Sequence, residues 1–363
     1  MKKINVAIIF GGKSAEHEVS LQSAKNVYDA LNKEKYNPIL VGIDKSGRWL
    51  LEEQSRFLID DDKPGSIKLS DSGDAITISP ESNVIISNIR DEGLEFPIDV
   101  AFPILHGPFG EDGTVQGLLK LANIPFVGSS VLGSAVGMDK DIMKRLLRDA
   151  KLPTPKFIAV RSDDTRPKFS DIVKQFNLPF FIKPANMGSS VGVSKVRKEE
   201  EYEEAMQLAF SFDLKILIEE YIDGREIECS VLGNDDPIAS IPGEVKPAHD
   251  FYSYEAKYMD EKGAILEIPA KVSKETTKRI QDLSIKAFKV LSCEGLGRVD
   301  LFLKKSGTII INEINTMPGF TKISMYPKLW EASGISYENL IDRLLQLAIE
   351  RFEKEKMLRT NYF

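Results

Sequence analysis

The chain has 363 residues, which is more than one hydrophobic core usually supports, so we expect two or three domains. Its composition, 42% hydrophobic and 28% charged, is typical of a folded soluble protein and excludes a disordered one. The formal net charge of −7 argues against duplex DNA or an anionic membrane as the main partner, because both attract clustered Lys and Arg.

Other classes are excluded by residue usage. The two cysteines, Cys229 and Cys293, cannot form a disulfide framework, and three histidines argue against a histidine-rich metal site. No stretch approaches the roughly 20 apolar residues of a membrane helix. The apolar run after the first residues ends at Gly11-Gly12, which is too early for a signal peptide. We therefore expect a cytoplasmic protein that binds neither nucleic acid nor a membrane.

The first third of the chain alternates between strand-like and helical patterns. The expected elements are strands over 5–10, 36–43 and 98–105 and helices over 19–31 and 114–122. Such alternation predicts a parallel α/β sheet that carries ligand groups at its strand ends. We place this domain at residues 1–127 and interpret residues 52–82, rich in Asp, Ser, Pro and Gly, as a surface excursion.

The remaining chain divides into a central domain at 128–216 and a last domain at 217–363. In the central domain we expect helices over 138–150 and 199–209 and strands over 179–184, 193–196 and 215–222. In the last domain we expect strands over 225–232, 238–245, 298–303 and 308–314 and helices over 274–291 and 337–353. Residues 246–267 lack periodicity, and a long irregular segment inside a compact domain is often an active-site lid.

A phosphate-binding loop is predicted at residues 183–192. The more familiar device is excluded, because Gly12-Lys13-Ser14 resembles the end of a P-loop but Ala7 stands where that motif needs Gly. Residues 183–192 either form a polar hairpin loop or hold phosphate through backbone N–H groups. Lys183 at a strand end, followed by two serines and two glycines, favours the second interpretation.

A metal site is predicted on two adjacent strands. Arg298 and Asp300 are two residues apart and share one face of their strand, as do Glu313 and Asn315 on the next. A turn at residues 305–307 would pair the strands and place Arg298 near Glu313, with Asp300 and Asn315 on the same face. Three oxygen donors suit Mg²⁺. The alternative is a half-exposed polar face, which we disfavour because burying unpaired carboxylates is costly.

Four further positions each have two interpretations. Gly319 could donate its N–H to an oxyanion beside Arg298, and Ser324 could hold a substrate carboxylate, or both could be turn residues. Glu16 follows the first glycine turn and either stabilises a helix dipole or binds a substrate ammonium. His106 begins a loop over 106–113 that is either an elaborate turn or a contact to the same substrate.

Together these segments resemble the D-alanine–D-alanine ligases, an ATP-grasp family, over essentially the whole chain. The resemblance is carried by GGKSAEHEVS at 11–20, HGPFGEDG at 106–113, MDK at 138–140, KPANMGSSVG at 183–192, YEAKY at 254–258, GRVD at 297–300 and NEINTMPGFT at 312–321. No position in these motifs departs from the family pattern. The resemblance implies an α/β, three-domain ATP-grasp fold with an N-terminal parallel, Rossmann-like domain.

The resemblance also implies roles for individual residues. ATP would lie between the central and last domains, held by Lys140, Lys183, Ser189, Ser190, Glu219, Glu220, Tyr221, Ile222, Glu226, Lys257 and Asn312. Mg²⁺, with Mn²⁺ as the alternative ion, would be bound by Asp300, Glu313 and Asn315. The substrate and catalytic residues would be Glu16, His106, Ser189, Tyr258, Arg298, Gly319 and Ser324, among which Glu16, Ser189 and Tyr258 would close the lid.

The implied reaction joins two D-alanines through an acyl phosphate, for peptidoglycan precursor synthesis, in a homodimer. One rival is a relative that makes D-alanyl-D-lactate or D-alanyl-D-serine. Tyr258 argues against the lactate-forming relatives, which differ at this position, although small pocket changes shift selectivity by only about 1–3 kcal/mol. A second rival is a catalytically silent nucleotide-binding protein, which is disfavoured because every metal ligand and phosphate lysine is present.

Overall fold

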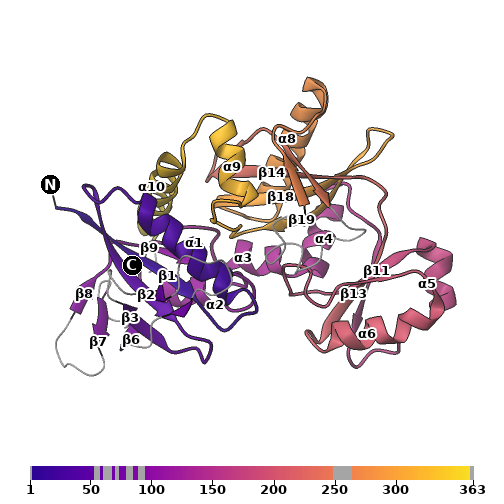
Figure 1. Ribbon diagram of the computed structural model, residues 1–363, viewed down its shortest axis with the longest axis horizontal. Helices are drawn as coiled ribbons and strands as arrows, with labels where there is room; N and C mark the ends of the chain where they lie inside the picture. Colours follow the sequence, from indigo (N-terminus) through magenta and orange to yellow (C-terminus); the bar gives the residue numbers. More distant parts are fainter. Residues whose placement is uncertain are drawn as a thin grey trace.

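The computed structural model describes residues 2–52, 58–59, 68–69, 73–78, 85–88, 95–247 and 264–359. Within these ranges the strands form three larger sheets and a small two-stranded ribbon. In Figure 1 the N-terminal sheet lies at the left, the C-terminal sheet at the upper centre and the small central sheet at the right. No helix in the described part of the chain has the length and hydropathy needed to cross a membrane.

The N-terminal sheet is mixed, although a parallel sheet was predicted. Its strands are β1 (Ile4–Gly11), β2 (Tyr36–Ile43), β3 (Trp49–Glu52), β6 (Asp74–Ile78), β7 (Ile85–Asn88), β8 (Glu95–Pro97) and β9 (Val100–Ile104), and β4 (Leu58–Ile59) with β5 (Lys68–Leu69) forms the ribbon. The parallel prediction is confirmed for β2, β1 and β9. The next strands are antiparallel, because a short turn after β2 reverses the chain and leaves no room for a crossover. The predicted surface excursion therefore contributes β6 to the sheet.

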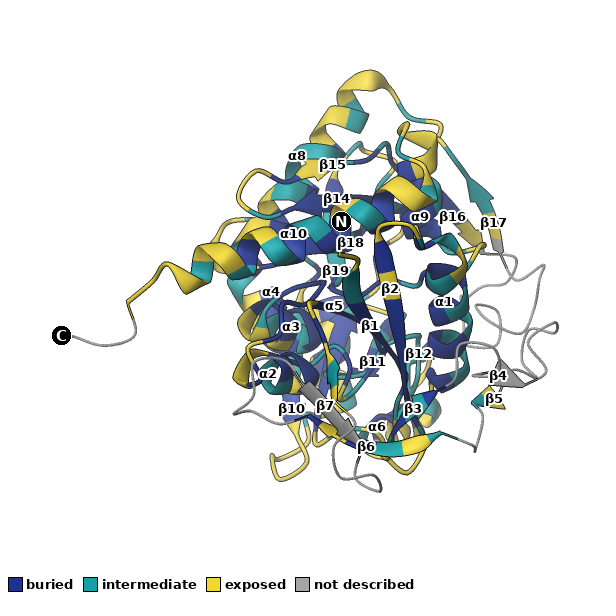
Figure 2. Cartoon of the chain, turned by 90° about the vertical axis from the view of Figure 1, so that its left-hand side faces the viewer, coloured by how far each residue is buried: buried dark blue, intermediate teal, exposed yellow. Residues whose placement is uncertain are grey.

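Both faces of β1 are buried, in two different cores. Val6, Ile8 and Phe10 pack into a cluster that also holds residues of the C-terminal helices, whereas Ala7 and Ile9 face the opposite cluster. The helices around this sheet are α1 (His17–Ala30), α2 (Thr114–Leu121) and α10 (Tyr337–Lys356), whereas α9 (Met325–Ala332) packs against α10 and β14. Figure 2 shows β1 and β2 as largely buried strands. Side chains of the C-terminal helices are thus part of the N-terminal core.

The central sheet is antiparallel and has the order β10-β13-β11-β12. Its elements are β10 (Phe157–Arg161), α5 (Phe169–Phe176), β11 (Phe180–Pro184), β12 (Ser194–Val196), the 3-10 turn η1 (Glu199–Glu201), α6 (Tyr202–Phe210) and β13 (Lys215–Glu220). Neither β10 nor α5 was predicted. The predicted domain boundary at residue 216 falls inside β13, which pairs with β10 and β11.

The C-terminal sheet has the order β17-β16-β14-β18-β19, with β15 also paired to β14. Its elements are β14 (Arg225–Gly233), β15 (Ile238–Ala239), β16 (Gly243–Pro247), β17 (Ala264–Glu267), α8 (Lys274–Val290), β18 (Gly295–Leu303) and β19 (Ile309–Asn315). The predicted strand over 238–245 is divided into β15 and β16 around Pro242, which cannot donate to a ladder. The ends of the predicted lid form the β16–β17 pair, and residues 248–263 lie outside the described part of the chain.

Two helices connect these sheets. The helix predicted over 138–150 is confirmed as α4 (Lys140–Asp149), and it is preceded by α3 (Val131–Met138), which was not predicted. They are separated at Asp139, whose side chain caps α4 by accepting hydrogen bonds from the N–H groups of Asp141 and Ile142. The apolar side of α4 packs into the C-terminal core through Met143 and Leu147. In Figure 1, α4 lies between the C-terminal sheet and the central sheet.

Arg351 joins α10 to the segment where the N-terminal domain ends. Its guanidinium is buried and donates to the carbonyl oxygens of Gly128 and Phe126 (2.9 Å for the latter), with Glu294 at 3.3 Å. We expect Arg351→Met to lower the free energy of unfolding by about 2–5 kcal/mol, because it leaves two carbonyl groups unpaired in the interior. The measurement is urea unfolding followed by circular dichroism.

Arg343 on the same helix provides the control. Its ion pair with Glu350 is about half exposed, and such pairs contribute about 0–1 kcal/mol. Arg343→Met should therefore leave the midpoint almost unchanged. Equal effects of the two substitutions on the unfolding midpoint would contradict the stabilising role of the buried Arg351 hydrogen bonds.

Candidate active site

Three segments that are distant in the sequence meet at Glu16. Its side chain is only 7% exposed, and one carboxylate oxygen accepts a hydrogen bond from the Ser189 hydroxyl of the predicted phosphate loop. A Cβ added to Gly107 or Gly188 would lie 3.0 or 3.1 Å from the other oxygen, so both loops approach it closely. Glu16 occupies the N-cap of α1, but its side chain makes no capping hydrogen bond. The carboxylate is therefore directed toward two loops, of which the Gly107 loop belongs to its own domain and the Ser189 loop to the central domain.

The predicted His106 loop is fixed against residues 315–321. His106 Nδ1 lies 3.1 Å from the carbonyl oxygen of Met317, and the Glu111 carboxylate accepts hydrogen bonds from the N–H groups of Gly107 (2.7 Å) and Met317 (3.2 Å). Burial lowers the pKa of His106, which keeps the ring neutral, whereas burial and the nearby Glu16 raise the pKa of Glu111. Glu111 was not predicted. Its motif marked the loop, but backbone partners cannot be recognised in a sequence.

The predicted metal ligands share one face, but their register differs from the prediction. Asp300, not Arg298, lies opposite Glu313, and Arg298 lies opposite Asn315. The difference arises from an irregularity of one residue between Asp300 and Leu301, which leaves Asn312 as the extra residue of β19. Arg298 and Glu313 are therefore diagonal neighbours on the predicted shared face and do not lie directly opposite each other. A bulge carries no clear mark in the sequence.

Positive groups already surround these carboxylates. Arg298 donates to both oxygens of Asp300 at 2.7 Å, and the Asn315 amide donates to the same carboxylate at 3.0 Å. Lys140 Nζ lies 3.4 Å from Glu313, and Glu228 pairs with Arg298 at 2.9 Å. The site thus offers concentrated charge of both signs, as a reaction of phosphate groups requires.

The donor set suits a small divalent cation. The described residues contain no group of three or more His, Cys, Asp or Glu side chains placed to hold a metal. Two facing carboxylates, Asp300 and Glu313, with the Asn315 amide are nevertheless the kind of partial set that Mg²⁺ completes with substrate phosphates and water. Asn312 Oδ1 is also buried, without a hydrogen-bond partner among the described residues. The residues therefore fit the group that the sequence implied.

A buried charged cluster lies beside this site. Glu219 is 3% exposed and pairs with Lys183 at 2.7 Å and with Lys144 at 2.8 Å. Burial alone would raise the pKa of Glu219, but the two lysines outweigh it and lower that pKa. Burial lowers the pKa of Lys144 to about 8. Lys144 was not predicted, because a lysine within an amphipathic helix is usually exposed.

The other predicted nucleotide contacts come from α4, from the loop between β11 and β12, and from the stretch that runs from the end of β13 into β14. Lys140 donates to the Met187 carbonyl at 2.7 Å, and Ser189 and Ser190 both have left-handed backbone conformations, with φ of 51° and 60°. Glu220 accepts from the Lys156 N–H at 2.8 Å, and Lys195 lies 4.3 Å from the Tyr221 ring centre. Ile222 is buried, and Glu226 faces Val245 of β16. Lys257 and Tyr258 lie outside the described residues.

Gly319 and Ser324 are in close contact. A Cβ on Gly319 would lie 2.8 Å from Ser324 Oγ, so any side chain at this position would displace that hydroxyl. The same hydroxyl accepts from the Thr321 N–H at 3.0 Å and lies 2.7 Å from the Thr321 hydroxyl. The two predicted residues therefore belong to one compact turn that leads into α9.

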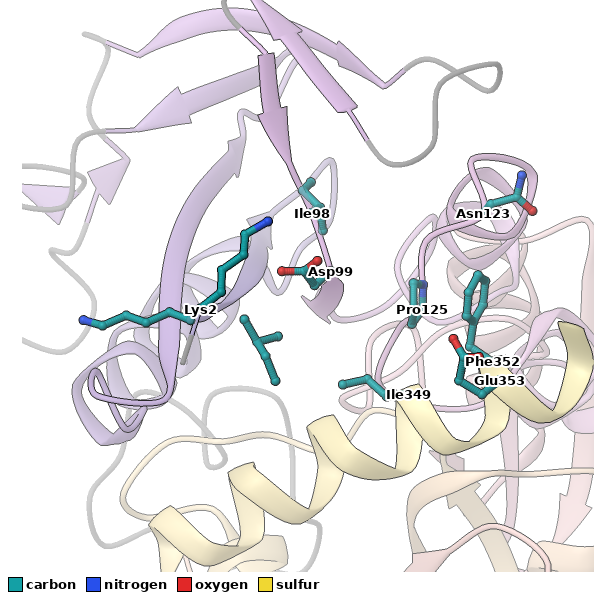
Figure 3. A pocket seen from close by; sticks show the side chains of 10 residues that line it. Lys2, Ile98, Asp99, Asn123, Pro125, Ile349, Phe352 and Glu353 are labelled. Atoms are coloured by element: carbon teal, nitrogen blue, oxygen red, sulfur yellow. The ribbon is translucent and has the colours of Figure 1, made fainter.

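A surface hollow on another part of the molecule is disfavoured as the ligand-binding site. It measures about 400 Å³ and is lined by Lys2, Ile98, Asp99, Asn123, Pro125, Ile349, Phe352 and Glu353, among others (Figure 3). These residues lie at the amino ends of β1 and β9, in the segment after α2 and on α10. Ligands of such sheets bind at the carboxyl ends, which is the edge where Glu16 and His106 lie.

Known proteins are similar to the chain along its whole length. The families described as "D-ala D-ala ligase N-terminus" and "D-ala D-ala ligase C-terminus" match residues 5–129 and 146–346. A D-alanine–D-alanine ligase of Oceanobacillus iheyensis is 56% identical and covers 99% of both chains.

Solved structures agree in fold. The D-alanine–D-alanine ligase of Coxiella burnetii superposes with a TM-score of 0.85 at 36% identity, covering 98% of this chain and 97% of that one. The VanG D-Ala:D-Ser ligase of Enterococcus faecalis reaches 0.82 at 35% identity, covering 96% and 100%.

Proposed function

The chain belongs to the D-alanine–D-alanine ligase family, and we propose that it joins two D-alanine molecules with ATP to supply peptidoglycan precursors. The observation that carries this function is the 56% identity to such a ligase over 99% of both chains. The family uses ATP and a divalent metal ion. We propose Mg²⁺ as that ion, with Mn²⁺ as an alternative, because the oxygen donors of Asp300, Glu313 and Asn315 suit both.

The first step makes a carboxylate reactive. The carboxylate oxygen of the first D-alanine attacks the γ-phosphorus of ATP, which releases ADP and forms an acyl phosphate. Glu16 would hold the ammonium of this D-alanine, because a buried carboxylate needs a positive partner, and His106 would border the same pocket. Lys140, Lys183, Ser189 and Ser190 would hold the phosphates. A metal bound at Asp300 would neutralise their charge.

The second step forms the peptide bond. The free amine of the second D-alanine attacks the acyl carbon, phosphate leaves with the bonding electron pair, and one proton of the amine passes to the released phosphate. Arg298 and the Gly319 N–H would stabilise the oxyanion of the tetrahedral intermediate. Ser324 would hold the carboxylate of the second D-alanine. The contact of Ser324 with Gly319 supports this, because one turn would then position both the nucleophile and the oxyanion.

The adenosine and lid contacts complete the proposal. As the family resemblance implies, the base and ribose would contact Glu219, Glu220, Tyr221, Ile222 and Glu226, and Asn312 would also contact the nucleotide. From the same resemblance, Lys257 would reach the phosphates, and Tyr258 would join Glu16 and Ser189 when the lid closes. The Glu16–Ser189 hydrogen bond supports this part, because two members of the group are already in contact.

The cellular setting and assembly are also proposals. Two buried free thiols, Cys229 and Cys293, suit a reducing compartment such as the cytoplasm, and burial raises their pKa values to about 11 and about 12. Both thiols are therefore protonated and unreactive at neutral pH. A homodimer follows from the family resemblance.

Phosphate release tests the function directly. With ATP, Mg²⁺ and one amino acid at a time, we expect D-alanine to support phosphate release, and D-alanyl-D-alanine to appear by chromatography. L-alanine should support neither. The VanG enzyme shows that a similar fold occurs in a D-Ala:D-Ser ligase, so D-serine and D-lactate are offered together with D-alanine. Preferential formation of a mixed product would contradict the proposed specificity, and no ATP turnover would contradict the reaction.

Glu16→Gln tests the first substrate site. Because charge-assisted hydrogen bonds contribute about 1.5–3 kcal/mol, we expect first-site affinity for D-alanine to fall about ten- to hundredfold. ATP affinity should change much less. Steady-state kinetics measures the change in first-site affinity for D-alanine. Titration calorimetry with ADP, used in place of ATP, measures the change in nucleotide affinity.

Glu18→Gln is the matched control. Glu18 lies on the exposed side of α1, paired with Lys45 at 2.6 Å, and should tolerate the same chemical change. Equal losses of ATP and D-alanine affinity in Glu16→Gln would point instead to a folding defect.

A further inference from the structure

Lys144 on α4 is fully buried, yet it belongs to none of the proposed substrate contacts. Its side chain has 0% exposed surface. Nζ lies 2.8 Å from Glu219 Oε2, 3.0 Å from the Asn312 carbonyl oxygen and 3.5 Å from Thr154 Oγ1. The amine therefore connects β13 of the central sheet with β19 of the C-terminal sheet. Burying a charged lysine costs free energy unless the amine is paired, so the role of this amine depends on what its partners do.

The Asn312 contact lies at the one irregular point of the β18–β19 ladder. From Leu303 opposite Ile309 to Leu301 opposite Ile311 the ladder is regular. If it continued, Asp300 would lie opposite Asn312, and Glu313 would point to the other face, because side chains alternate. The extra residue shifts the pairing by one and brings Glu313 opposite Asp300.

Neighbouring groups hold the outer edge of this bulge. Among the strands that the structure describes, β19 lies at the edge of its sheet, with β18 as its only neighbour. Lys144 donates to the Asn312 carbonyl, and the Ile311 N–H donates to the Pro153 carbonyl at 2.8 Å. One turn earlier on α4, Lys140 lies 3.4 Å from Glu313. The same face of α4 thus supports both the bulge and the carboxylate that the bulge reorients.

We propose that Lys144 is a positioning residue that holds the Asn312 bulge and thereby keeps the Glu313 carboxylate opposite Asp300, where both can bind the divalent cation. It acts through Asn312 and not by touching substrate or metal. The inference deepens the proposed function and rests on its metal site. Because the same amine pairs with Glu219, it also ties the nucleotide-contacting strand to the metal-binding strand.

Cation binding, separate from turnover, tests the inference. Mn²⁺ is titrated into the full-length protein saturated with a non-hydrolysable ATP analogue, and free Mn²⁺ is measured by electron paramagnetic resonance. We expect Lys144→Met to weaken Mn²⁺ binding about ten- to hundredfold, the range for a lost hydrogen bond to a charged group. Affinity for the analogue in EDTA should change less. Lys174→Met removes a lysine that is 75% exposed on α5 and should leave Mn²⁺ binding unchanged.

A double variant separates positioning from simple charge balance. Lys144→Met leaves Glu219 with one lysine fewer, which by itself could weaken folding, so Lys144→Met/Glu219→Gln is compared with Glu219→Gln alone. The inference predicts weaker Mn²⁺ binding in the double variant. Equal binding would mean that Lys144 acts only through Glu219 and would overturn it, as would unchanged binding in Lys144→Met. If the unaltered protein bound no Mn²⁺, the proposed metal site would itself be wrong.

Discussion

The catalytic face of this protein depends on one extra residue in a β-strand. Side chains alternate along β19, so a regular ladder would place Asp300 and Glu313 on opposite faces of the sheet. The bulge at Asn312 brings the two carboxylates opposite each other, with Asn315 and Arg298 as the next facing pair. The proposed cation site and the proposed Arg298 contact to the oxyanion would both depend on this register. The proposed role of Lys144 at this bulge would account for an interior lysine despite its cost in desolvation.

A second constraint is the meeting of three domains at a buried carboxylate. Glu16 comes from the N-terminal sheet, Ser189 from the central sheet, and the 315–321 turn from the C-terminal sheet is tied to the same place through His106 and Glu111. A carboxylate that is 7% exposed is stable only with donors around it, and a substrate ammonium is the strongest donor available. If Glu16 binds the substrate ammonium as proposed, the same carboxylate would couple substrate binding to the arrangement of the domains.

Periodicity predicted the long elements well, because their burial is regular. The strands β1 and β2, the helix α8 and the strand β18 all lie within a few residues of the predicted ranges. The sequence did not reveal β10, α3, α5 or α9, which have only five to eight residues each and so show too little periodicity. Most of the candidate site residues were found through motifs, but not the Arg298–Asn315 register, Glu111 or Lys144. Each of these features depends on a contact to a backbone group. Because the backbone is chemically the same at nearly every position, the sequence does not show where such contacts form.

The position of the bound cation tests the central claim most directly. Crystals grown with Mn²⁺ and a non-hydrolysable ATP analogue would show the ion by its anomalous scattering. The account predicts a peak between Asp300 and Glu313, within coordination distance of both carboxylates and of a nucleotide phosphate. A peak that contacts only one of these carboxylates, or Glu313 turned to the opposite face of β19, would contradict it.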